Sequence, residues 1–334
     1  CGSKTPKTDP NATRIFTDST GREVELPAQI DKVALSGPLA QIVLFALCPD
    51  KLVGVSNAWS SEAQEFLDEK YFNMPQIGQL YGGKGELNLE TLLQSGAQVV
   101  IDVGESKGSI KEDMDSLQQQ TGLPFVHISA DMQSYPQAYR MLGDLLGMKT
   151  EAEALATYCE KIYSRTETIA SGVEKANVLY VTGDMGQNVI AKGAYHAEIL
   201  DMLTNNLAQV DEPSSKGTGN EVSMEQILTW NPDVVIFAPE SIYAAVKDDA
   251  AWQSVTAIKN GAYYEVPFGP YNWMGFPPSV QRYLGMVWLS KLLYPDATAD
   301  YDLFADVQEY YKLFYHCDIT RAQYDALVAN SIGK

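Results

Sequence analysis

Short apolar runs alternate with amphipathic segments along most of the chain. In the first half, runs short enough for strands lie at 33–36, 52–56, 97–103 and 124–129, and helical patterns follow them, as at 38–47 and 60–72. The alternation restarts in the second half with runs at 177–184, 233–239 and 262–267. Strands that alternate with helices are typical of a parallel sheet covered on both faces. The pattern therefore predicts an α/β fold with two Rossmann-like lobes, each built on a mostly parallel sheet.

A single long helix is predicted between the two lobes, over residues 150–174. Its apolar and small side chains share one helical face: Leu155, Tyr158, Cys159, Ile162, Thr166, Ile169 and Val173. Thr150 and Glu153 fit a capping box at its start. About 23 residues at 1.5 Å each give a rod of roughly 35 Å. We expect a flexible leash at 1–13, an N-terminal lobe at 14–148, a bridging helix at 149–175 and a C-terminal lobe at 176–334.

One helix-then-strand pattern occurs twice. The segment LNLETLLQSGAQVVI (87–101) matches VSMEQILTWNPDVVI (222–236). Glu90 and Glu225 are in equivalent places, and each segment ends with Val-Val-Ile. The repetition predicts the same supersecondary unit in each lobe.

The two glutamates follow residues that are suited to cap a helix. Asn88 and Ser223 fit N-caps, and Gln226 completes a capping box with Ser223. Glu90 and Glu225 then stand at the second helical position, where the helix dipole favours a carboxylate. That local stabilisation would explain each glutamate alone. Two acidic side chains in matching places would equally give a partner protein two anchor points for basic sockets.

Composition and charge narrow the class of protein. The 334 residues are 45% hydrophobic and 20% charged, as in soluble globular proteins, and carry a formal net charge of −19. An acidic surface argues against nucleic-acid binding and against adhesion to anionic lipid. The sequence contains no run of 18 apolar residues, so no spanning helix is predicted.

The four cysteines differ in their context. Cys48, Cys159 and Cys317 are scattered and suggest no disulfide framework. Cys1 is followed by a small, polar segment, which is what remains when a bacterial lipoprotein signal is removed before a lipidated cysteine. An arbitrary start at a cysteine is the alternative. A leash of about eleven residues reaches roughly 20 Å, which would hold the globular part beside a membrane.

The order of these motifs resembles a known family. GREVELP (21–27), the two glutamate-containing segments, the long helix between them and a Trp- and Pro-containing loop before a C-terminal helix are similar to substrate-binding lipoproteins of ABC importers. Within these, the chain resembles the group whose lobes are joined by one helix and which carries ferric siderophores, haem, cobalamin or related metal complexes. The likeness covers about residues 14–330.

The resemblance implies a monomeric receptor that lies outside the cytoplasm, is held to the bacterial cell membrane by a lipid on Cys1, and binds cargo between its lobes. It implies that Glu90 and Glu225 meet arginines of the membrane permease. Among cargoes we expect a ferric siderophore or haem first, a corrinoid next and a metal chelate or oxyanion last. No enzymatic cofactor is implied.

Cargo-binding residues are expected in loops that follow the carboxyl ends of strands, where such loops converge. In the loop FGPYNWMGFPP (268–278), the part from Gly269 onward holds three aromatics and a methionine between glycines and prolines. These side chains suit a flat or metal-chelating cargo, although the loop could also be packed on itself. The candidate ligand-binding residues are Trp59, Tyr81, Met185, Tyr195, His196, Tyr271, Trp273, Met274 and Arg282.

Two of these candidates carry specific chemistry. His196 would be an axial ligand of haem or metal, or else a hydrogen-bonded structural residue. Arg282 would bind an anionic cargo with its guanidinium, or else be a solvated helix residue. His127 falls inside a strand pattern and His316 beside Cys317, so no histidine pair has ligand-like spacing and no dedicated metal site is predicted.

An enzyme and an adhesin are the competing functions. GQLYGGKG (78–85) resembles a phosphate-binding loop, but Gly85 stands where a serine or threonine must bind magnesium. Dinucleotide, zinc-protease and nucleophile-elbow motifs are missing, and so are the cysteine ligands of a metallocluster reductase. We therefore expect a receptor without enzymatic activity.

Overall fold

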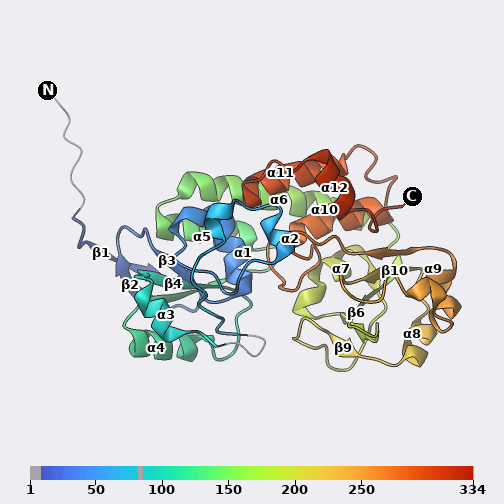
Figure 1. The fold of residues 1–334 in the computed structure, drawn as a ribbon, viewed down its shortest axis with the longest axis horizontal. Helices are drawn as coiled ribbons and strands as arrows, with labels where there is room; N and C mark the ends of the chain where they lie inside the picture. Colours follow the sequence, from blue (N-terminus) through green and yellow to red (C-terminus); the bar gives the residue numbers. More distant parts are fainter. Residues whose placement is uncertain (1–8, 82–85, 334) are drawn as a thin grey trace. The chain divides into compact units, whose positions relative to one another are not determined.

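The computed structural model describes residues 9–81 and 86–333 (Figure 1). These residues form two compact units. Unit 1 comprises residues 9–58 and Asn73–Thr157, and unit 2 comprises Trp59–Phe72 and residues 158–333. None of the described helices is long and apolar enough to cross a membrane.

Unit 1 holds an antiparallel hairpin and a three-stranded parallel sheet. The hairpin pairs β1 (Thr13–Thr17) with β2 (Glu23–Pro27), and the sheet order is β3-β4-β5, with β3 at Val33–Leu35, β4 at Val99–Gly104 and β5 at Phe125–Ser129. Its helices are α1 (Pro38–Leu47), α3 (Leu89–Gln94), α4 (Ile110–Thr121) and α5 (Tyr135–Leu146). The strand predicted at 52–56 is wrong, because those residues make only isolated bridges, Val33 with Leu52 and Val55 with Gln76, on either side of η1 (Pro49–Lys51).

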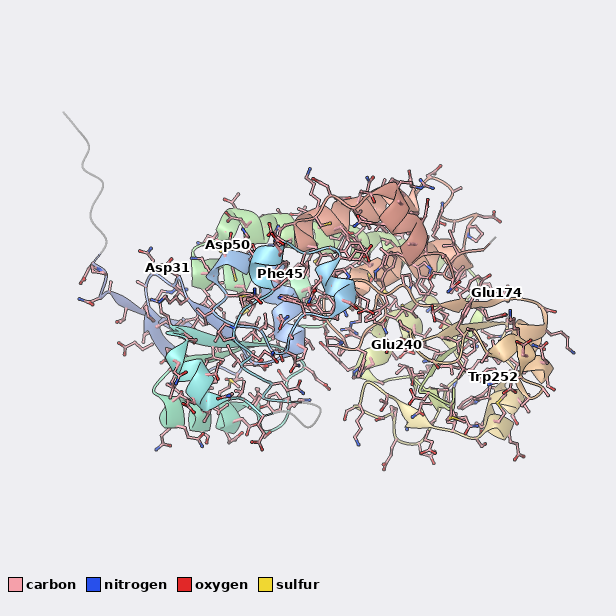
Figure 2. All side chains as sticks on the ribbon, in the orientation of Figure 1. Asp31, Phe45, Asp50, Glu174, Glu240 and Trp252 are labelled. Carbon is pink, nitrogen blue, oxygen red and sulfur yellow. The ribbon has the colours of Figure 1, made fainter. Side chains whose placement is uncertain are left out.

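Helices cover both faces of this sheet. Figure 1 shows α1 and α5 on one side of β3 and β4, and α3 and α4 on the other. Phe45 of α1, labelled in Figure 2, is 3% exposed, and the Tyr139 hydroxyl of α5 donates to the Val43 carbonyl of α1. On the opposite face, Ala34, Val100 and Phe125 pack against Leu92, Ile110 and Met114. This three-layer arrangement confirms the predicted α/β fold for unit 1.

Unit 2 contains a mixed sheet of order β11-β10-β6-β7-β9, with β8 paired to β6. Four strands run parallel, β6 (Asn177–Thr182), β8 (Asn205–Asn206), β10 (Val234–Phe237) and β11 (Tyr263–Glu265). The short strands β7 (Asn188–Val189) and β9 (Asn220–Glu221) add antiparallel pairs. The predicted mostly parallel sheet is confirmed here too.

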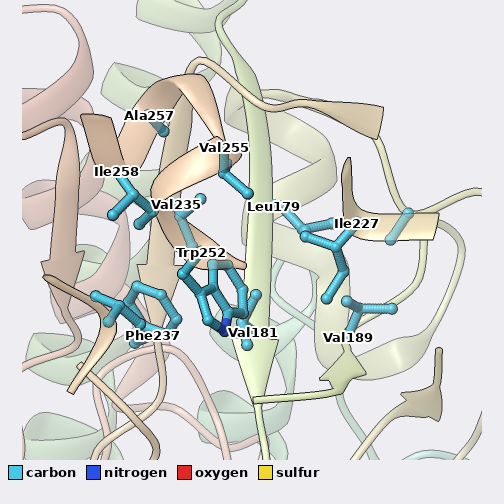
Figure 3. Close-up of a cluster of buried hydrophobic side chains, with 12 residues drawn as sticks. Leu179, Val181, Val189, Ile227, Val235, Phe237, Trp252, Val255, Ala257 and Ile258 are labelled. Carbon is cyan, nitrogen blue, oxygen red and sulfur yellow. The ribbon is translucent and has the colours of Figure 1, made fainter. Parts of the chain in front are cut away.

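One face of this sheet is covered by α8 (Met224–Trp230), η5 (Trp252–Ser254) and α9 (Thr256–Lys259). Figure 3 shows Trp252 among Val181 of β6, Val235 and Phe237 of β10 and Ile258 of α9, and these side chains are at most 4% exposed. Because alternate residues of a strand point to the same face, this cluster takes residues 179 and 181 of β6 and residues 235 and 237 of β10.

The remaining helices of unit 2 are α7 (Glu198–Leu203), α10 (Arg282–Leu293), α11 (Leu303–Tyr315) and α12 (Arg321–Leu327), and α10 packs on α7 and α11. Short helical turns are α2 (Ser61–Gln64), η2 (Glu69–Tyr71), η3 (Tyr195–Ala197) and η4 (Val246–Asp248).

The segment Trp59–Phe72 differs from the prediction in two ways. The sequence predicted one helix over 60–72 within the N-terminal lobe, but the segment forms only α2 and η2 and belongs to unit 2. The Phe66 ring contacts the Tyr311 ring of α11 edge to face, with centroids 5.3 Å apart. This aromatic contact joins the segment to unit 2.

The predicted long helix is present as α6 (Lys149–Gly172), and the boundary between the units falls within it, between Thr157 and Tyr158. Its 24 residues correspond to about 36 Å. The predicted capping box at Thr150 is wrong, because the Ala152 amide already bonds the Met148 carbonyl and Thr150 lies inside the helix. Glu153 instead forms an ion pair with Arg140, at 2.9 Å.

Candidate ligand-binding site

One face of the unit 1 sheet changes from apolar to polar along its strands. At the amino ends that face carries Ala34, Val100 and Phe125, which lie in the core. Two residues further on, the same alternation brings Ser36, Asp102 and His127 to that face. All strands of this sheet are parallel, so these polar groups gather at one edge, where loops at strand ends form binding sites.

Asp102 and His127 are the centre of this polar edge. They are partners in the register of β4 and β5, so their side chains lie next to each other on one face. The His127 Nδ1 is 2.6 Å from Asp102 Oδ2, and the Ser36 hydroxyl donates to Asp102 Oδ1 at 2.5 Å. The Asp102 residue is 8% exposed and His127 is 0% exposed. The buried carboxylate therefore fixes the orientation of the imidazole.

The other imidazole nitrogen faces two serines, and we call the three atoms the serine–histidine triangle. His127 Nε2 lies 3.1 Å from the Ser106 hydroxyl and 3.2 Å from the Ser129 hydroxyl, and the two hydroxyl oxygens are 2.6 Å apart. Ser106, in the loop after β4, is exposed, and Ser129, at the end of β5, is half-buried. The triangle thus connects a buried carboxylate to hydroxyls at the surface of unit 1.

The same edge holds the start of α1. Ser36 is followed directly by Gly37 and by Pro38, the first residue of α1, so the positive end of the helix dipole lies at this edge. Gly104 ends β4 with φ 139°, and a Cβ there would lie 3.1 Å from the Leu39 side chain. The close approach of α1 to β4 therefore depends on glycine at this position.

Tyr81, the one predicted ligand residue in unit 1, is half-buried. Its hydroxyl donates to the Asp113 carboxylate of α4 at 2.5 Å, and Lys107 Nζ lies 5.4 Å from its ring centroid. Burial and the hydrogen bond to Asp113 raise the pKa of Tyr81 far above its ordinary value. The phenol is therefore a neutral hydrogen-bonding group at physiological pH.

The predicted ligand residues of unit 2 differ widely in exposure. Trp59 is 6% exposed and its indole donates to the Tyr71 carbonyl at 2.8 Å. Trp273 and Met274 are 0% and 2% exposed, and they pack on Gly285 of α10. Tyr271 is half-buried and its ring lies 6.3 Å from that of Tyr315. Most of the loop 268–278 is therefore packed on its own unit.

Two apolar side chains of unit 2 stand exposed on loops. Met185, a predicted ligand residue between β6 and β7, is 75% exposed. Phe276 is 63% exposed and has φ 65°, a backbone conformation that aromatic residues rarely adopt. Phe276 was not among the predicted ligand residues. The feature of the sequence that could have identified it is its place between Gly275 and two prolines.

Arg282 is buried and heavily bonded. Its guanidinium donates to the carbonyls of Tyr195 and Pro278 at 2.9 and 3.1 Å, and pairs with the Glu198 carboxylate at 3.0 Å. It also lies 5.0 Å from the Tyr195 ring centroid. The solvated alternative for Arg282 is therefore wrong, since the residue is 0% exposed. His196, next to Tyr195 in η3, is half-buried.

The two glutamates of the repeated segment occupy the predicted places. The Asn88 side chain accepts from the Thr91 amide at the start of α3, and the Ser223 side chain accepts from the Gln226 amide at the start of α8. Glu90 and Glu225 are both exposed in the first turn of these helices. Each carboxylate is therefore accessible on its own unit.

Metal-binding chemistry is limited in the described part of the chain. Across residues 9–81 and 86–333, no three His, Cys, Asp or Glu side chains are grouped so that they could hold a metal ion. Cys48 and Cys159 are buried free thiols, and burial raises the pKa of Cys48 to about 12. Cys1, the predicted lipidation site, lies outside the described residues, as does Gly85.

Two curated proteins are similar to the chain over most of its length. The molybdate-binding protein MolA of Haemophilus influenzae is 24% identical over 334 residues, with 91% of each chain covered. A substrate-binding lipoprotein of an ABC transporter, YvrC of Bacillus subtilis, itself uncharacterized, is 22% identical over 282 residues, with 80% of this chain and 84% of that protein covered.

The fold is also similar to that of a solved structure, an ABC transporter solute binding protein from Sulfurospirillum deleyianum. The TM-score is 0.86 at 25% identity, and the match covers 95% of this chain and 99% of that one. Residues 33–269, more than half of the chain, match the model of the periplasmic binding protein family. The protein therefore belongs to the periplasmic binding protein family and is an extracytoplasmic, non-enzymatic solute-binding receptor of an ABC transporter.

Proposed function

We propose that this receptor binds a small oxyanion of the molybdate type and delivers it to an ABC permease. The observation that carries the proposal is the group of hydroxyls around Asp102 and His127 at the carboxyl edge of the unit 1 sheet. Hydroxyls bind oxyanions by donating hydrogen bonds, and the start of α1 at the same edge favours negative charge.

The relative that binds molybdate supports this choice of cargo. The prediction from sequence ranked iron complexes first and an oxyanion last, and the aromatic loop 268–278 was the feature that favoured a flat or metal-chelating cargo. Trp273 and Met274 of that loop are almost fully buried, so they offer little surface to a flat cargo. We therefore place an oxyanion first.

A calorimetric titration of the full chain with sodium molybdate tests the proposal. We expect saturable binding by the wild type, and affinity about tenfold to hundredfold weaker in the double variant Ser106→Ala/Ser129→Ala, since a hydrogen bond to a charged group contributes about 1.5–3 kcal/mol. The double variant Ser164→Ala/Ser171→Ala, which changes two exposed serines of α6, is the matched control and should bind like the wild type. A wild type that binds no molybdate contradicts the proposal.

A metal chelate with an organic ligand is the second candidate cargo. The exposed side chains of Met185 and Phe276 favour it, because apolar groups on loops suit an apolar ligand surface. Titration with haem or a ferric siderophore, followed by tryptophan fluorescence, tests this candidate. Saturation that is lost in Met185→Ser/Phe276→Ser would support it over the oxyanion.

Delivery requires contact with the permease. We propose that Glu90 and Glu225 bind basic side chains of the permease and that a lipid on Cys1 holds the receptor at the membrane. Exposure of both carboxylates in the first turns of α3 and α8 supports the docking role. The lipoprotein among the relatives supports the anchor.

A further inference from the structure

The serine–histidine triangle has a fixed number of hydrogens. Asp102 accepts from Ser36 and from His127, so the imidazole hydrogen of a neutral ring lies on Nδ1 and Nε2 is an acceptor. One serine hydroxyl must then donate to Nε2. The 2.6 Å separation of the two serine oxygens shows that the other hydroxyl donates to the first. Both hydroxyl hydrogens are used inside the triangle.

With a neutral ring, the two serines therefore present only oxygen lone pairs outward. A fully deprotonated oxyanion also presents only lone pairs. The two surfaces would repel, because hydrogen bonds need a donor on one side. If the hydrogen bonds of the triangle are kept, binding of such an anion at Ser106 and Ser129 requires one more hydrogen.

A proton on His127 supplies that hydrogen. In an imidazolium, Nε2 donates to one serine, that serine donates to the other, and the second hydroxyl hydrogen is released outward to the ligand. Each proton taken up by His127 therefore frees one serine hydroxyl to donate a hydrogen bond to the ligand. The positive ring, paired with Asp102, also attracts the anion.

We propose that an oxyanion binds at the Ser106 and Ser129 hydroxyls together with one proton from solvent, held on Nε2 of His127. The inference rests on the proposed function and names the chemistry by which that same site selects its cargo. His127 is a positioning residue for the hydroxyl hydrogens, and Asp102 fixes the ring. The affinity for a deprotonated oxyanion then falls as the pH rises.

Other charged groups surround His127 from the neighbouring elements. Asp18, in the β1–β2 turn, accepts from the His127 backbone amide at 3.1 Å and forms an ion pair with Arg22, also at 3.1 Å. Arg22 further pairs with Asp115 of α4 at 2.7 Å. Asp113 of α4 bonds Tyr81 and Ser109. Asp18, Asp115 and Asp113 thus have partners of their own, and Asp102 is the carboxylate that contacts the ring, at 2.6 Å.

The test is a titration of the full chain with sodium molybdate at several values between about pH 7 and about pH 9, where the free anion is deprotonated. Calorimetry in buffers of different ionisation enthalpy measures the protons taken up for each anion bound. Nitrogen NMR of the chain labelled at its three histidines reports the protonation of each ring. The variant His127→Gln identifies the signal of His127 and carries an amide that takes up no proton.

The expected result is uptake of about one proton per anion, a fall in affinity of up to about tenfold per pH unit, and an Nε2 that becomes protonated on binding. His127→Gln should bind without proton uptake. Binding by the wild type without proton uptake, or with a His127 ring that stays neutral, overturns this inference. The proposed function as an oxyanion receptor would still stand in that case. A wild type that binds no molybdate overturns the proposed function as well. Where His127→Gln fails to fold, the variants His196→Gln and His316→Gln assign the other two histidine signals, so the wild-type NMR result still decides the question.

Discussion

Asp102 and His127 stand opposite each other on neighbouring parallel strands, with Oδ2 and Nδ1 2.6 Å apart in the interior of unit 1. The pair links the hydrophobic core at the amino end of the sheet to hydroxyls at its carboxyl end. A buried carboxylate of this kind is retained only where its hydrogen bonds are satisfied, and here Ser36 and His127 supply them.

Replacing Asp102 with asparagine should damage both the fold and the site. The amide would place a donor against one of two groups that now donate to the carboxylate, so Asp102→Asn should lower the free energy of unfolding by about 1–3 kcal/mol. We also expect molybdate affinity to fall at least about tenfold. Urea unfolding and calorimetry measure the two effects. Asp144→Asn, which removes a half-exposed ion pair with Arg14, is the control and should cost at most about 1 kcal/mol.

Acid should weaken unit 1 through Asp18. Burial alone would raise the pKa of Asp18, but hydrogen bonds from Thr20 and from the amides of His127 and Arg22 outweigh it, so its pKa lies below the ordinary value of 3.8. A carboxyl whose pKa is lowered by folding stabilises the folded state above its unfolded pKa and loses that contribution as the pH falls through the folded pKa. Asp18→Asn should therefore be less stable than the wild type at neutral pH.

The difference between Asp18→Asn and the wild type should shrink below about pH 4, where the wild-type carboxyl begins to be protonated in the unfolded state. Thermal unfolding followed by circular dichroism over this range measures it. A difference that stays constant from neutral to acid pH would show that the charge of Asp18 does not contribute.

Arg282 should matter for stability more than for cargo affinity. It is fully buried and bonded to Glu198, Tyr195 and Pro278, and removal of one partner of a buried ion pair costs about 3–5 kcal/mol. We expect Arg282→Met to lower the midpoint of thermal unfolding while molybdate affinity, measured on the folded fraction below that midpoint, stays within about twofold. Loss of affinity with unchanged stability would instead assign Arg282 to the ligand.

The two exposed glutamates should matter for transport alone. Glu90→Ala/Glu225→Ala should keep the wild-type cargo affinity and stop uptake by the reconstituted receptor and permease. The control variant Glu112→Ala/Glu167→Ala removes the same charge from exposed positions of α4 and α6 and should transport normally. Equal loss of cargo affinity in the first variant would remove the basis for a docking role.

The repeating patterns of the chain were sufficient to predict its architecture. Alternation of apolar runs and helices predicted both sheets, and helical spacing predicted α6, because burial of one face imposes these periods. Short-range details were less predictable. The cap of α6 was misplaced because Gly147 ends α5 with φ 66° and α6 begins within two residues. The segment 59–72 was assigned to the wrong unit because the Phe66 contact with Tyr311 is distant in sequence.

The candidate site was the hardest part to predict. Asp102, Ser106, His127 and Ser129 lie within about thirty residues, but only the register of β4 and β5 brings Asp102 beside His127. His127 was predicted only as a strand residue, and most of the predicted ligand residues were aromatic. An alternating strand that changes from apolar to polar toward its carboxyl end was the signal that could have identified this edge.

The decisive observation is which cargo the receptor carries in its native host. We suggest purifying the receptor from its native host without added ligand and measuring both its elemental content and its visible absorption spectrum. We expect a bound oxyanion of a metal such as molybdenum, close to one per chain, with no haem or catecholate absorption. A stoichiometric iron complex with a visible chromophore, and no oxyanion, would contradict the proposed function.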